Sequence, residues 1–122
     1  MEKSKKTFII NTLRRGTYRW PGRWLAEKRS ALGKGFYYCE NEICGVIVKK
    51  NQTQMDHTEP VIPVYKTTAD TSLDEIAERM FCSPDGFKRL CKDCHSIKTR
   101  SENEQRPSTE KPKKGKKRAK KT

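Results

Sequence analysis

This chain has few of the residues from which a large apolar core or a membrane span is built. Hydrophobic residues make up 32% of its 122 positions and aromatic residues 8%, while charged residues make up 35%. No apolar run approaches the length that crosses a bilayer, which argues against a transmembrane protein. A small domain with so little apolar material needs a further source of stability, such as a metal ion or disulfides.

The sequence also lacks a secretory signal. The first residues, MEKSKK, lead into the short stretch TFII and then into polar and basic positions, which is not the pattern of a signal peptide. We therefore expect a cytoplasmic protein whose cysteines are reduced. Disulfides are the alternative use of the five cysteines.

Four of the cysteines are spaced as metal ligands. Cys91 and Cys94 form a Cys-x2-Cys pair at the start of a predicted helix, and Cys39 and Cys44 form a second pair upstream. Two such pairs can complete a tetrahedral zinc site, so we predict a structural Zn²⁺. Cys82 remains outside this set, and we expect it to pack as a small apolar side chain.

The chain has two histidines, and each lies beside a residue with metal or acid–base chemistry. His95 directly follows the second cysteine pair, so a zinc ion would anchor it while its ring faces elsewhere. Asp56 and His57 lie between the two cysteine pairs and should be brought opposite His95. Because neighbouring residues of a strand point to opposite faces, we expect one of Asp56 and His57 to bind a metal while the other does different work.

The third feature is a large excess of positive charge. The formal net charge is +13, of which residues 107–122 contribute +7, from eight Lys or Arg and one Glu. A charge of this size indicates a polyanionic partner, and nucleic acid is the first candidate, with an acidic protein or a membrane surface as alternatives. The basic residues that we predict to contact nucleic acid are Arg14, Arg15, Arg19, Arg23, Lys98 and Arg100.

Local patterns divide the chain into three parts. Residues 1–34 form a basic, partly helical arm, with helices predicted for residues 5–18 and 21–32 and with Gly33 as the stop of the second. Its aromatic and Arg residues would either follow a DNA backbone or pack on the domain. Residues 35–104 form the cysteine-containing domain, with strands at 36–38, 46–48, 53–58 and 87–90 and with helices at 70–81 and 91–103. Residues 105–122 are a Lys-rich tail that we expect to be disordered.

Taken together, these motifs resemble the four-cysteine, zinc-stapled branch of the HNH endonucleases. The resemblance rests on Cys39-x4-Cys44, on Asp56-His57, and on the run from Leu90 through Cys91-x2-Cys94-His95 to Lys98-Thr99. The segments Leu13-Arg14-Arg15, Arg19-Trp20-Pro21 and Met80-Phe81-Cys82 look like those of small bacteriophage HNH proteins. The resemblance covers about residues 12–103. It implies an α+β fold containing a ββα-metal (HNH, or His-Me finger) domain.

The resemblance also implies an activity and partners. It implies metal-dependent hydrolysis of phosphodiester bonds in DNA, with Asp56 and His95 holding a catalytic Mg²⁺ or Mn²⁺ and His57 acting as general base. Through phage HNH proteins that work beside terminases, the resemblance also implies phage packaging proteins such as terminase as partners. The alternative is a catalytically inactive zinc module that binds nucleic acid. The chain departs from the family at its middle residue, usually Asn, because Gly86 stands there, with Asp85 as a candidate substitute.

Overall fold

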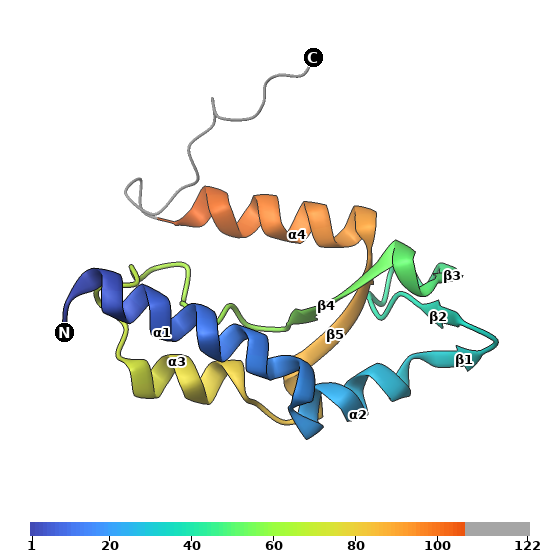
Figure 1. The fold of residues 1–122 in the computed structure, drawn as a ribbon. Coiled ribbons are helices and arrows are strands. Elements are labelled where there is room, and N and C mark those ends of the chain that lie inside the picture. The colour runs from blue at the N-terminus through green and yellow to red at the C-terminus, as the bar shows by residue number, and fades with distance from the viewer. Residues whose placement is uncertain (107–122) are drawn as a thin grey trace, which may run out of the picture.

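The computed structural model describes residues 1–106, so the tail predicted for residues 105–122 lies outside the described residues from position 107 on. The described part is an α+β structure with two small antiparallel sheets (Figure 1). No helix in this part is both long and apolar enough to cross a bilayer. In chain order the elements are α1 (Lys3–Gly16), η1 (Thr17–Arg19), α2 (Pro21–Arg29), β1 (Ala31–Gly33), β2 (Phe36–Tyr38), β3 (Ile47–Lys49), η2 (Lys50–Gln52), β4 (Thr53–His57), α3 (Leu73–Met80), η3 (Pro84–Gly86), β5 (Phe87–Cys91) and α4 (Lys92–Gln105).

The prediction of a helix through residue 32 is wrong at its end. α2 stops at Arg29, and β1 then pairs with β2 in a hairpin. Gly33 is therefore not a helix stop; it opens the hairpin turn, in which Gly33, Lys34 and Gly35 have φ angles of +93°, +57° and +81°. The helix ends early because Ser30 is fully buried, where its hydroxyl accepts a hydrogen bond from Arg89 Nε at 2.7 Å.

The larger apolar cluster joins the N-terminal helix to the middle of the chain. Ile10 of α1 packs with Val61 and with Ile76 and Met80 of α3, and Figure 1 shows α1 lying along α3. The helix predicted at residues 70–81 belongs to this cluster and not to the one around the cysteines. Its apolar positions meet α1 instead, so the first helix is part of the core of the fold.

The start of α3 follows its local sequence. Ser72 Oγ accepts a hydrogen bond from Glu75 N at 3.1 Å, as the capping-box spacing predicts. This contact satisfies one of the free N–H groups at the helix start. α3 then ends at Met80, whose backbone carbonyl reaches the functional site described below.

The second part of the fold consists of β4, β5 and α4. The two strands pair antiparallel, with Asp56 opposite Lys88 and His57 opposite Phe87. α4 follows β5 directly and packs against both strands. In Figure 1, α4 and α1 lie on either side of β4. Residues from β4, α1 and α4 are therefore brought to one place.

Candidate functional site

The four cysteines of the two predicted pairs meet at one point. Cys39 and Cys44 flank the turn after β2, while Cys91 ends β5 and Cys94 lies in the first turn of α4. Their sulfur atoms all lie within 4.8 Å of one another, and those of Cys44 and Cys91 are 3.9 Å apart. Zinc with Zn–S bonds of about 2.3 Å places its sulfurs about 3.8 Å apart, so this cluster could hold a metal ion such as zinc.

The surroundings of the cysteines also suit a cation. The side-chain amide of Asn41 donates to Cys94 Sγ at 3.4 Å, and the Asn41 carbonyl accepts from Cys44 N at 2.9 Å, which closes the turn between the first two ligands. Burial, followed by hydrogen bonding with Cys91, raises the pKa of Cys94 to about 12. A divalent cation would offset this penalty by stabilising the thiolates. Cys82 is not part of the cluster.

The cysteine cluster fixes the start of α4, and one turn later His95 lies against β4. His95 Nε2 is 3.9 Å from Asp56 Oδ1, so the structure brings these two predicted ligands together. Two ligands at about 2.1 Å from one octahedral ion are separated by about 3.0 to 4.2 Å. The donor pair, one carboxylate and one imidazole, is therefore spaced as the ligands of a single Mg²⁺ or Mn²⁺ ion would be.

Lys98 forms an ion pair with the other carboxylate oxygen of Asp56. Lys98 Nζ donates to Asp56 Oδ2 at 2.7 Å, to Glu102 Oε2 at 2.5 Å and to the His57 carbonyl at 3.0 Å, so its three N–H groups each have an acceptor. Burial lowers the pKa of Lys98, but the bonds to Asp56 and Glu102 outweigh it and the pKa is raised. A charged ammonium group thus sits on Asp56 Oδ2, next to the oxygen that faces His95.

His57 points to the other side of β4, as the alternation of a strand predicts. Its Nε2 lies 2.9 Å from the Met80 carbonyl, and its ring packs on Phe87 with centroids 4.7 Å apart. Since a carbonyl can only accept, Nε2 carries the proton, and the lone pair of a neutral ring is on Nδ1. Burial is the main cause that lowers the pKa of His57, with smaller contributions from Arg14 and Arg23. The ring is therefore neutral near pH 7.

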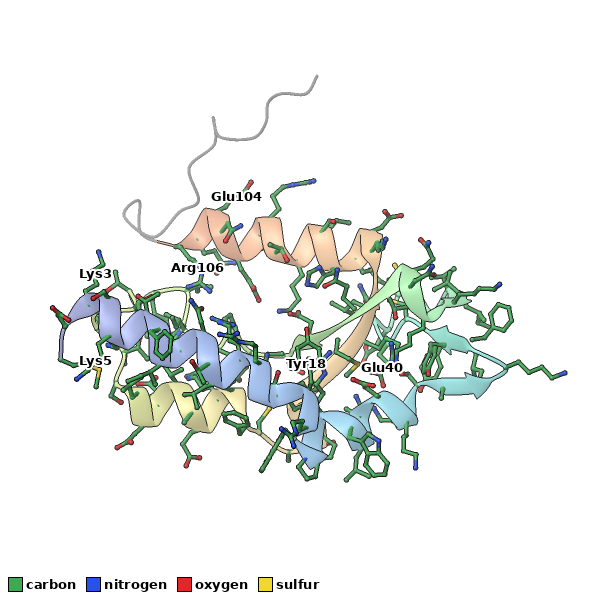
Figure 2. All side chains as sticks on the ribbon, in the orientation of Figure 1. Lys3, Lys5, Tyr18, Glu40, Glu104 and Arg106 are labelled. Atoms are coloured by element: carbon green, nitrogen blue, oxygen red, sulfur yellow. The ribbon has the colours of Figure 1, made fainter. Side chains whose placement is uncertain are left out.

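Asp56 and His57 line the same open pocket of about 270 Å³ despite pointing to opposite faces. Arg14 of α1, Lys98 of α4 and Arg106 line it as well. Arg106 follows the end of α4 (Figure 2). The pocket thus combines three cationic side chains with the carboxylates of Asp56 and Glu102 and a neutral imidazole. Such a combination suits a phosphate ester and a water molecule beside it.

The remaining predicted basic residues are not all at this pocket. Arg23 pairs with Glu27 at 3.0 Å and stacks on Tyr18. Arg15, Arg19 and Arg100 are exposed on the surface. The sequence reasoning missed Glu102 and Arg106 as pocket residues. Glu102 stands four positions after Lys98, a spacing that signals a helical ion pair, whereas nothing local indicates the role of Arg106.

Gly86 lies against Cys82, which explains why no larger residue stands there. A Cβ atom at position 86 would come within 2.3 Å of Cys82 Sγ. The Gly86 carbonyl accepts from Thr58 N at 2.8 Å, so backbone atoms brace the residue after His57. Asp85 is exposed and lines a different pocket, so its side chain is not brought to Asp56.

The packing at Gly86 gives a testable prediction. We expect Gly86→Asn to lower the free energy of unfolding by about 1–3 kcal/mol, because the new side chain overpacks against Cys82. Adding Cys82→Ala should recover part of this loss, and Cys82→Ala alone is the control. Urea unfolding of the three variants gives the coupling between the two positions. Strictly additive effects would contradict the contact.

Comparisons with models of protein families, with curated proteins and with solved structures each found no match. The interpretation of the site therefore depends on its geometry and on the sequence motifs.

Proposed function

We propose that this protein is a metal-dependent DNA endonuclease of the zinc-stapled HNH type, which hydrolyses phosphodiester bonds. One observation carries the proposal: Asp56 and His95 are 3.9 Å apart, and His57 lines the same pocket as Asp56. The arrangement of β4, β5 and α4, with four cysteines at the start of α4, supports the ββα-metal interpretation. The net charge of +13 supports DNA as the partner.

The residues of this pocket, together with His95 beside Asp56, would divide the work of hydrolysis. Asp56 and His95 would hold a Mg²⁺ or Mn²⁺ ion, which when bound supplies positive charge against the phosphate oxygens. His57 Nδ1 accepts the proton of the attacking water, since Nε2 is committed to the Met80 carbonyl. Arg14 and Arg106 hold the phosphate by charge from the two helices that flank it. One base in one pocket favours cleavage of one strand at a time.

A second candidate is a zinc module that binds nucleic acid without cleaving it. The specific observation in its favour is the Lys98 ammonium group, which already pairs with one oxygen of the carboxylate that would hold a catalytic ion. Supercoiled plasmid incubated with the protein and with Mg²⁺, Mn²⁺ or Ni²⁺ separates the two candidates. The nuclease proposal predicts relaxed or linear plasmid only when an ion is present. Plasmid that is retarded on a gel but stays supercoiled with every ion would support the binding module.

The position of Lys98 predicts competition with the catalytic ion. Lys98→Met should strengthen Mn²⁺ binding by about tenfold, or about 1.4 kcal/mol, because Asp56 loses its tethered cation while the length of the side chain is kept. Loss of the free Mn²⁺ signal in electron paramagnetic resonance measures the binding. Arg100→Met removes one exposed charge from the same helix and is the matched control. Equal Mn²⁺ affinities of the parent and Lys98→Met would show that Lys98 does not compete.

A further inference from the structure

A second pocket lies next to the first along β4. Thr53, Gln54 and Met55 line this pocket, and the following residues of the strand, Asp56 and His57, line the first. The second pocket is open and has a volume of about 660 Å³. Its charged residues are four cations and one carboxylate: Arg23, Lys50, Arg89, Lys92 and Glu27. The excess of three positive charges makes it a basic pocket.

Arg89 is the unusual member of this set. It is only 2% exposed and is the largest fully buried side chain among the described residues. Its guanidinium group donates from Nε to Ser30 Oγ at 2.7 Å and from Nη1 to Thr53 Oγ1 at 2.8 Å. Nη2 has no hydrogen-bond partner, and no other buried side-chain nitrogen or oxygen in the described part of the chain lacks one. Hydroxyl groups alone do not neutralise a buried charge.

The nearby carboxylates already form ion pairs with other arginines. Glu40 accepts two bonds from Arg29, at 2.6 and 3.0 Å, and a third from the backbone N of Arg89 at 2.7 Å. Glu27 pairs with Arg23 at 3.0 Å. Neither carboxylate is hydrogen-bonded to the guanidinium of Arg89. The charge of Arg89 is therefore buried without a counter-ion of its own.

Tyr37 compensates this charge only in part. Its ring covers one face of the Arg89 guanidinium, 3.9 Å from Cζ to the centroid. A ring face stabilises a cation from above, whereas the N–H groups of a guanidinium lie in its plane and need acceptors there. Nη2 still needs a hydrogen-bond acceptor. An anion would supply this acceptor and would also neutralise the positive charge of Arg89.

We propose that the pocket formed by Arg23, Lys50, Arg89 and Lys92 binds a phosphate group of a nucleic acid strand. An oxyanion seated against Arg89 would supply the acceptor that Nη2 lacks, and the exposed Lys50 and Lys92 would neutralise its remaining charge. A phosphate suits the planar donors of a guanidinium better than a spherical anion does. The identity of the strand as DNA rests on the proposed function, whereas the anion site itself does not.

The place of this pocket gives it a role in positioning the substrate. Thr53 and Asp56 are three residues apart on β4, which corresponds to about 10 Å. A nucleic acid strand that runs along β4 would therefore place one phosphate at Arg89 and a nearby one at Asp56. A strand anchored in this way keeps its register while the next pocket acts on it.

The test uses the full chain with its zinc and with no divalent ion added, so that cleavage plays no part. Inorganic phosphate and a short DNA duplex are titrated separately while the Arg89 side-chain N–H signal is followed by nuclear magnetic resonance. We expect a saturable shift of this signal with the duplex. A duplex that binds without moving the signal overturns the proposal, whatever inorganic phosphate does. No shift with either ligand overturns it as well.

Two exposed lysines make a second test that does not disturb the buried arginine. Lys50→Gln with Lys92→Gln should lower the salt dependence of duplex binding by about one unit of slope for each lysine and weaken the shift at Arg89. The matched control, Lys3→Gln with Lys5→Gln, removes the same charge from the far end of α1 (Figure 2). If both pairs change binding and the Arg89 signal equally, the pocket has no specific role. Failure of plasmid cleavage alone would leave this result intact and affect only the nuclease proposal.

Discussion

Cys91→Ser should abolish metal binding and the cooperative unfolding of this domain. The serine oxygen is a poor ligand beside three thiolates, so the metal content should fall from about one zinc per chain to about none. Structural zinc contributes roughly 10–16 kcal/mol to the folding of small zinc peptides, which is as large as the whole stability of an ordinary domain. The apolar cluster around the cysteines cannot replace it, because this cluster consists mainly of Cys39, Leu90 and Cys91 themselves.

Metal analysis and thermal unfolding monitored by circular dichroism measure these effects. Cys82→Ser is the matched control, since Cys82 lies outside the cluster and should leave the zinc content unchanged. Chelation of the parent should reproduce the behaviour of Cys91→Ser. A Cys91→Ser protein that keeps one equivalent of zinc and the melting temperature of the parent would show that the four sulfurs are not a metal site.

Much of the local structure could be predicted because its causes are local. Each cysteine pair can be recognised from a spacing of a few residues, and the structure brings the four sulfurs within 4.8 Å of one another. The start of α3 follows from Ser72 and Glu75, which are three residues apart. Strand alternation likewise predicts that the side chains of residues 56 and 57 point to opposite faces of β4. Asp56 pairs with Lys98, whereas the His57 ring contacts the Met80 carbonyl.

The rest depends on residues that are distant in sequence. The early end of α2 depends on the bond between Arg89 and Ser30, which are 59 residues apart. The tautomer of His57 is set by a backbone carbonyl, which carries no sequence signal. Lys98 and Asp56, which are far apart in sequence, meet because α4 packs against β4. Tertiary contacts of this kind decide the chemistry of the site and cannot be derived from periodicity.

His57→Gln should lower the rate of plasmid cleavage by about 10²–10⁴-fold and leave the fold intact. The glutamine amide can still donate to the Met80 carbonyl, as His57 Nε2 does, but it cannot accept a proton from water. The measurement is the single-turnover rate of nicking at saturating Mn²⁺. Thr58→Ala, a change at the exposed neighbouring residue, is the control and should stay near the parent rate. Equal rates for His57→Gln and the parent would exclude His57 as the base.

The pH dependence of the parent follows from the same residue. The base acts when it is neutral, and burial holds the pKa of His57 below its ordinary value of about 6.5. Cleavage should therefore be constant near pH 7 and above, and fall as the pH drops through this lowered pKa. A cation bound at Asp56 moves the pKa in the same direction, because it disfavours the protonated ring. The residual cleavage rate of His57→Gln should no longer fall at low pH. This result would assign the titrating group to His57 rather than to His95. An acid limb that persists unchanged in the variant would assign the titrating group elsewhere.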